Sequence, residues 1–152
     1  MYGLATIWKI FSNSSLNLYQ ELYKNLPEIT IAEKIIKLRK THNLERHELA
    51  DMLGLHFDTV IRWEQGVFPK PENVKLLGEL FCIPIEYFHE YYSIYYSSYQ
   101  GKIREWKDKN KYSYSMAAGI LGVSHSGFAR LLSGKVRLSY DMYLKLQSMD
   151  VF

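Results

Sequence analysis

The sequence predicts an all-α protein built from two consecutive helical modules. Three observations lead to this prediction. Apolar residues recur at helical spacing along most of the chain, capping residues and glycines stand where these runs begin and end, and one pattern recurs after 68 positions. The chain has 152 residues, which is enough for two small domains.

The composition is that of a folded globular protein, with 47% hydrophobic and 23% charged residues. The single cysteine, Cys82, excludes a disulfide framework and a cysteine metal cluster, and we expect it to be buried beside Phe81. No apolar run reaches the ~20 residues needed to cross a bilayer, and residues 1–11 lack the features of a signal peptide. We therefore expect a cytoplasmic protein with no membrane partner.

Residues 1–29 are expected to form an N-terminal helical extension. Ser15 is placed to cap a helix that Pro27 ends. The apolar stripe of this helix consists of leucines and tyrosines: Leu16, Leu18, Tyr19, Leu22, Tyr23 and Leu26. Two roles stay open for this stripe, a brace on the following module or a dimer contact.

The first module is predicted over residues 30–90. It begins with a capping box of Thr30 and Glu33. Two short amphipathic helices follow, the first ending at Gly54 and the second at Gly66, where a left-handed turn is expected. Two short helices joined by a tight glycine turn make a helix-turn-helix motif. A further helix and a closing turn bring the module to five helices.

Residues 30–90 resemble the phage-repressor helix-turn-helix family (Cro-like, or xenobiotic-response-element) over the whole length of that domain. The matching residues are Leu38-Arg39, Leu49-Ala50, Leu53-Gly54, Thr59-Val60, Trp63-Glu64, Gly66, the Pro69/Pro71 loop and Ile85-Glu86-Tyr87-Phe88. The resemblance implies a sequence-specific regulator of transcription that binds double-stranded DNA, of phage or mobile-element type, with a repressor favoured over an activator. It also implies a buried ion pair between Arg39 and Glu64.

A second copy appears without gaps when the sequence is shifted by 68 positions. The paired residues are Ile35 and Ile103, Ala50 and Ala118, Leu53 and Leu121, Gly54 and Gly122, Arg62 and Arg130, and Gly66 and Gly134. Residues 101–152 are therefore predicted to form a smaller, four-helix, helix-turn-helix-like domain, with Ser124 and Ser139 as N-caps. The alternative is a helical dimerisation domain. The Tyr-rich segment 91–100 is expected to be a linker whose aromatic side chains pack between the modules.

One short helix of such a motif enters the major groove while its partner braces it on the backbone. By resemblance the groove helix of the first module is 57–65. Arg62 is suited to a bidentate contact with guanine, and Phe57 to a thymine methyl. Asp58 is expected either to cap its helix or to accept from cytosine. The predicted DNA-binding residues of this module are Arg46, His56, Phe57, Asp58, Thr59, Ile61, Arg62 and Lys70. Trp63 is expected in the core.

The second module carries its own predicted contact residues, which are hydroxyls, an imidazole and cations: Ser124, His125, Ser126, Arg130, Lys135 and Arg137. Residues 100–152 hold nine Lys/Arg against four Asp/Glu, whereas residues 28–92 hold eight against eleven. Long-range attraction to phosphates should therefore come mostly from the second module. The remaining cations are expected on a solvated face: Lys102, Arg104, Lys107, Lys109 and Lys111.

Nothing in the sequence predicts catalysis. The five histidines form no His-Glu-x-x-His pattern, and neither a Gly-rich phosphate loop nor a nucleophile elbow is present. We expect no enzymatic activity, metal, cofactor or small-molecule ligand. The expected partner is double-stranded DNA, and a homodimer is one possibility. A rival class stays open, in which a protein-interaction adaptor or antitoxin-like component uses the helix-turn-helix folds for assembly.

Overall fold

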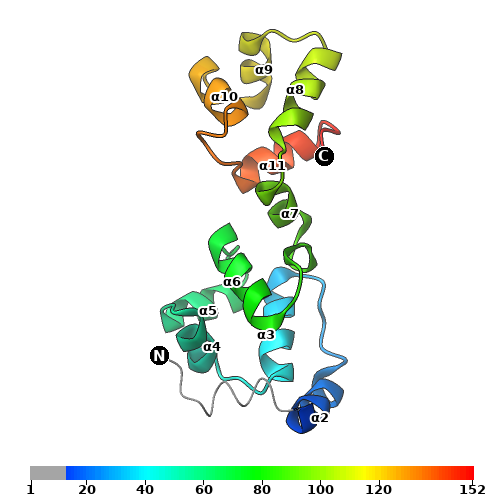
Figure 1. Ribbon diagram of the computed structural model, residues 1–152, viewed down its shortest axis with the longest axis vertical. Helices are drawn as coiled ribbons and strands as arrows, with labels where there is room; N and C mark the ends of the chain where they lie inside the picture. The colour runs from blue at the N-terminus through cyan, green and yellow to red at the C-terminus, as the bar shows by residue number, and fades with distance from the viewer. Residues whose placement is uncertain (1–12) are drawn as a thin grey trace. The chain divides into compact units, whose positions relative to one another are not determined.

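The computed structural model describes residues 13–152, with side chains from residue 18 onward, and in this part of the chain every regular element is a helix (Figure 1). The all-α prediction is confirmed. The chain divides into two compact units, residues 1–89 and 90–152. The expectation about residues 1–11 lies outside the described residues. None of the described helices is both long and apolar enough to span a membrane.

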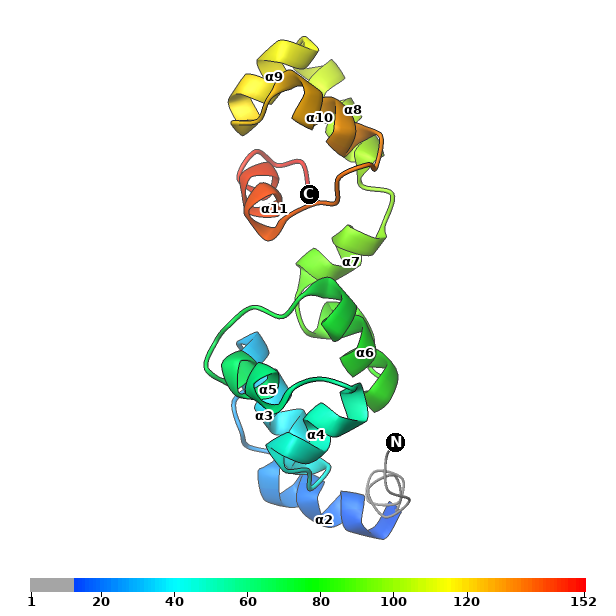
Figure 2. The same ribbon diagram turned by 90° about the vertical axis from the view of Figure 1, so that its left-hand side faces the viewer.

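The first unit contains five α-helices and a closing 3₁₀ turn within the described residues: α2 (Asn13–Tyr23), α3 (Ile31–Thr41), α4 (Arg46–Leu53), α5 (Phe57–Glu64), α6 (Pro71–Phe81) and η1 (Ile85–Tyr87). Helices α3, α4 and α5 meet around a common core (Figure 2). Residues that are almost completely buried fill that core: Ile35, Leu49, Val60, Trp63, Val74 and Leu77.

The caps of this unit follow the sequence prediction at most places. Thr30 accepts from the Glu33 N–H and Glu33 accepts from the Thr30 N–H, so the capping box is confirmed. Gly54, with a φ of 67°, ends α4. Gly66, with a φ of 99°, ends the turn that follows α5. Cys82 differs from the prediction. It is exposed, because it adopts the left-handed conformation that ends α6 and so points away from the helix's buried face.

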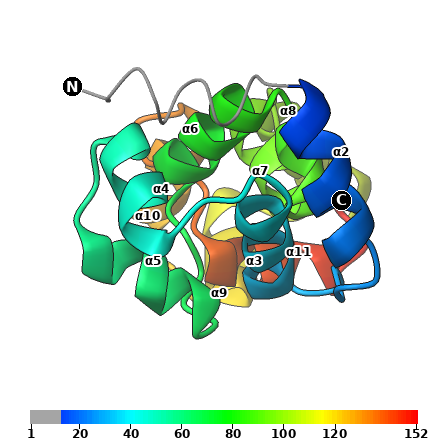
Figure 3. The same cartoon turned by 90° about the horizontal axis from the view of Figure 1, so that it is seen from below.

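Helix α2 packs beside α3 (Figure 3) but does not bury its whole apolar stripe. It begins at Asn13, so Ser15 lies within the helix rather than at its N-cap. The rings of Tyr19 and Tyr23 stack at 6.5 Å between centroids. Leu18 and Leu22, in contrast, remain 66% and 63% exposed.

The second unit contains five helices: α7 (Glu90–Tyr96), α8 (Gln100–Lys109), α9 (Tyr114–Leu121), α10 (His125–Leu132) and α11 (Tyr140–Gln147). The expected four are α8 to α11. Ser124 accepts from the Gly127 N–H and Ser139 from the Met142 N–H, so both serines are N-caps as predicted. The core of the second unit consists of buried apolar residues, among them Ile103, Leu121 and Phe128.

The Tyr-rich segment is part of the second unit and not a linker. Helix α7 buries Tyr91 and Tyr92 in that unit. The Tyr91 hydroxyl donates to the Leu138 carbonyl at 2.8 Å, and the Tyr99 hydroxyl accepts from the Leu138 N–H at 3.1 Å. These contacts span about forty residues of sequence, which is why the sequence predicted aromatic packing here but not its place within the second unit.

The two units share one local geometry at a spacing of 68 residues. The bounds of α4 and α5 recur as those of α9 and α10 without any shift in register. Every described positive-φ residue also has its counterpart 68 positions away, in four pairs: Asn43 and Lys111, Gly54 and Gly122, Gly66 and Gly134, and Cys82 and Asp150. The repeat detected in the sequence therefore extends to the backbone conformation of each turn.

Candidate nucleic-acid interface

Helix α5 has two distinct faces, which make it suited to lie on a partner. Val60 and Trp63 are 0% and 3% exposed and anchor the inner face. Phe57 is 43% exposed at the start of the outer face. The left-handed turn at Gly54 sets the direction in which the chain enters α5 from α4. The other predicted contact residues on the body of α5 are half-buried or exposed and lie outside the core: Thr59, Ile61 and Arg62.

A buried carboxylate holds α5 to two other helices. Glu64, whose side chain is 3% exposed, accepts from Arg39 Nε at 2.6 Å and from Arg39 Nη2 at 3.3 Å. The buried ion pair implied by the resemblance is therefore present. Arg39 Nη1 also donates to the Leu44 carbonyl at 2.8 Å. This pair joins α3, which supports the motif, to the predicted groove helix.

The same carboxylate also holds Arg46, a contact that the sequence did not predict. Arg46 Nε donates to Glu64 Oε2 at 2.6 Å, and the Arg46 side chain is 49% exposed. Glu64 thus links the start of α4 to the end of α5. The two residues are 18 positions apart, a separation at which sequence pattern carries no signal.

The N-terminus of α5 is capped by His56, so the expectation that Asp58 caps this helix is wrong. His56 Nδ1 accepts from the Asp58 N–H at 3.3 Å. The Asp58 carboxylate lies 3.5 Å from the same ring nitrogen, and both side chains are largely exposed. Asp58 stands in the first turn, where its charge is favourable to the helix dipole. An imidazole can serve as a cap because its unprotonated ring nitrogen is an acceptor.

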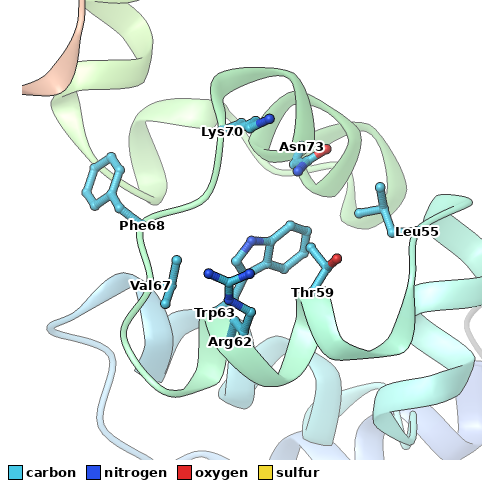
Figure 4. A pocket seen from close by; sticks show the side chains of 8 residues that line it. All are labelled: Leu55, Thr59, Arg62, Trp63, Val67, Phe68, Lys70 and Asn73. Carbon is cyan, nitrogen blue, oxygen red and sulfur yellow. The ribbon is translucent and has the colours of Figure 1, made fainter.

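A pocket of about 330 Å³ lies between α5, α6 and the loop that joins them (Figure 4). Arg62 and Lys70, two of the predicted contact residues, stand on its walls together with Thr59 and Asn73. Trp63 forms its floor. The structure thus brings Arg62 and Lys70 to one concavity beside the outer face of α5.

The predicted contact face of the second unit lies on α10. The Ser124 and Ser126 hydroxyl oxygens are 3.2 Å apart, and the His125 ring lies 5.9 Å from that of Tyr114 on α9. Phe128, on the opposite side of α10, is completely buried. This helix therefore divides into a core face and a polar face in the same way as α5. The predicted contact residues on the polar face are all exposed: Ser124, His125, Ser126 and Arg130.

The loop after α10 carries Lys135 and Arg137, both exposed. The Arg137 guanidinium lies over the Tyr95 ring at 5.7 Å from its centroid. The next residue, Leu138, is the one held by the Tyr91 and Tyr99 hydroxyls. The tyrosines therefore fix the end of this basic loop, a role that their sequence position did not reveal.

The second unit replaces the Arg39–Glu64 pair with a different link. Leu132 occupies the position of Glu64, and its carbonyl accepts from Arg104 Nη2 at 2.6 Å. Arg104 is thus engaged rather than simply solvated. Lys107 also departs from the predicted solvated face, since its side chain is only 14% exposed and pairs with Asp108. The three remaining cations are exposed as expected: Lys102, Lys109 and Lys111.

Within the described residues, no group of three or more His, Cys, Asp or Glu side chains gathers in a way that could hold a metal ion. The polar side chains that α5 and α10 expose are hydroxyls, an imidazole, a carboxylate and one arginine on each helix, and the loops that follow add lysines and an arginine. Such groups act by hydrogen bonding and charge, which is the chemistry of phosphate and base-edge contacts.

Comparison with known proteins places the first unit. Repressor protein C of Escherichia phage P2 is 38% identical to the chain over 47 residues, which is 31% of this chain and 48% of that protein. The matched region thus spans about half the length of the relative. No solved structure gives a significant match. Residues 35–88 match a family described as helix-turn-helix. Together with the geometry of α3 to η1, the family match identifies residues 35–88 as a helix-turn-helix domain, and over 47 residues the chain is similar to a phage repressor.

Proposed function

We propose that the chain is a sequence-specific, double-stranded-DNA-binding regulator of transcription, of the repressor type and of phage or mobile-element style, with α5 as its groove helix. The observation that supports this most is the two-faced α5. Its inner face is fixed by Val60 and Trp63, and its end by the Arg39–Glu64 ion pair. The Arg62 side chain stays outside the core. A rigidly held helix with an available arginine fork can read a guanine edge in the major groove.

Helix α10 is the proposed second reading helix, through Arg130 and the exposed residues around its N-terminus. In support, α10 recurs at the position of α5 after 68 residues, with the same turn before it and the same positive-φ glycine after it. The net positive charge of residues 100–152 would supply much of the attraction to phosphate. Two modules in one chain would read two adjacent half-sites, and a homodimer would double that number.

Selection from a pool of random duplexes tests the proposal. The full chain should enrich a motif with two half-sites. Arg62→Ala should relax one half-site and Arg130→Ala the other, each at a cost of about 1–3 kcal/mol of discrimination. Arg62→Lys is the matched control: it keeps the charge but loses the bidentate fork, so it should relax the same base positions while the salt dependence of binding changes little.

Two observations favour a rival function, a protein-interaction adaptor or antitoxin-like component. Phe57 is 43% exposed at the start of α5, and residues 28–92 carry a net negative charge, both of which suit a protein partner better than phosphate. The affinity for duplex DNA measured at several salt concentrations separates the two functions. A DNA-binding regulator shows a negative slope of log K against log salt, whereas an adaptor shows no DNA affinity to plot.

A further inference from the structure

Trp63 is a core residue whose one polar atom stays open to a pocket. The residue is only 3% exposed, and its indole N–H makes no hydrogen bond to another described residue. Among the described residues, no fully buried side-chain nitrogen lacks a partner, so the Trp63 nitrogen must reach the surface. Figure 4 shows the ring at the floor of the pocket, with its nitrogen toward Val67 and Phe68 and away from Thr59. An indole N–H is a donor only, and in such a place it normally finds an acceptor.

The pocket above Trp63 is rich in donors. Arg62 and Lys70 carry positive charge, and neither side chain makes a hydrogen bond or ion pair with another described residue. Thr59 and Asn73 add a hydroxyl and an amide. Among the eight residues that line the pocket, none is acidic. This lining therefore favours a ligand that accepts hydrogen bonds and carries negative charge.

We propose that this pocket seats a phosphate group, with the Trp63 N–H as the donor at its floor and Lys70 as its charged wall, while Arg62 keeps its proposed role at a base edge. Phosphate oxygens accept only, and charge-assisted hydrogen bonds to them are stronger than neutral ones. The rest of the lining includes apolar surface from Val67 and Phe68, which suits a sugar attached to the phosphate. The inference rests on the proposed function in naming the source as the backbone of bound duplex DNA, and it makes Trp63 a DNA-binding residue that the sequence assigned to the core alone.

The test follows the ¹⁵N–¹H resonances of the indole groups in the full chain. Trp63→Phe assigns the Trp63 signal, and Trp106, in the second unit, is the matched control. The protein is titrated in one arm with a duplex taken from the random-pool selection, and in the other with inorganic phosphate. We expect the duplex to shift the Trp63 resonance strongly and to leave Trp106 less affected. Trp63→Phe keeps an aromatic ring but removes the donor, so the dissociation constant for DNA should rise by about tenfold.

The outcomes separate this inference from the proposed function. If the duplex binds and the Trp63 resonance does not move, the phosphate seat is refuted while DNA binding stands. If Trp63→Phe fails to fold, Trp8→Phe and Trp106→Phe assign the other two indole signals, and the remaining resonance of the native chain still decides. If no duplex binds but inorganic phosphate shifts Trp63, the seat takes a free anion and the regulator proposal falls. If neither arm shifts Trp63, the pocket does not bind phosphate.

Discussion

Replacing Glu64 with Gln is expected to destabilise the first unit by about 3–5 kcal/mol. Glu64 and Arg39 are both almost fully buried, with side chains 3% and 8% exposed. Loss of the carboxylate charge leaves the Arg39 guanidinium buried without its counter-charge, and its remaining acceptors, the Leu44 carbonyl and the introduced amide oxygen, are both neutral. A buried charge without its partner costs several kcal/mol, whereas a solvated pair is worth little.

The loss of stability should decrease in the order Glu64→Gln, Arg39→Met and Arg46→Ala, because Glu64 has two partners of different exposure. Arg39→Met leaves the Glu64 carboxylate paired with Arg46 at 2.6 Å, so its cost should be smaller, about 1–3 kcal/mol. Arg46→Ala removes a partner that is 49% exposed and should cost at most about 1 kcal/mol. Asp51→Asn, at an exposed position on α4, is the control and should change stability by no more than about 0.5 kcal/mol.

Urea unfolding measured separately for each unit provides the assay. The chain has two compact units, so a single unfolding transition cannot be assumed. The indole resonance of Trp63 reports the first unit and that of Trp106 the second. The three variants should lower the midpoint seen at Trp63 in the stated order and leave the midpoint seen at Trp106 in place. If Glu64→Gln and Arg46→Ala lowered the urea midpoint equally, Glu64 would not be the buried carboxylate on which the first unit depends.

Three further predictions concern single sites. Gly122→Ala should destabilise the second unit by about 1–2 kcal/mol because φ is +70° there, whereas Gly101→Ala, in open helical surroundings, should stabilise it by about 0.5–1 kcal/mol; urea unfolding monitored at Trp106 distinguishes the opposite signs. Tyr99→Phe removes the acceptor of the buried Leu138 N–H, so we expect the second unit to lose about 1–3 kcal/mol of stability and the Leu138 amide to exchange its hydrogen faster. An unchanged exchange rate would contradict this role of Tyr99. Burial lowers the pKa of His42 below its ordinary value of 6.5, so as the pH falls the unfolded chain takes up this proton first. The contribution of His42 to the free energy of unfolding is therefore present above pH 6.5 and is lost as the pH drops below 6.5. If the free energy of unfolding of a His42→Gln variant had the same pH dependence as that of the native chain, this prediction would be wrong.

The helices and their turns were predictable from the sequence because their signals are local. Thr30, Ser124 and Ser139 cap helices through contacts with amides three residues away. Glycines mark the left-handed turns because a residue without Cβ adopts positive φ at little cost. Their recurrence at Gly122 and Gly134 makes the repeat visible in the amino-acid sequence alone.

The start of α5 and the end of α6 were not predictable from neighbouring residues. His56, not Asp58, caps α5, although carboxylates are far commoner caps. Cys82 follows an apolar residue and its neighbours suggest a core position, yet it takes the left-handed conformation at the end of α6. In both cases the choice depends on the backbone path around the helix end, which neighbouring residues alone do not specify.

The sequence by itself determined the helix class, the turns at the glycines and the 68-residue repeat, since these follow from contacts within a few residues. The tertiary structure decided which side chains meet. Glu64 binds Arg46 as well as Arg39, two tyrosines hold Leu138, and the indole of Trp63 opens on a pocket of donors. Most of these partners lie many residues apart along the chain, and only the packing of helices fixes which of the available donors and acceptors come within hydrogen-bonding distance.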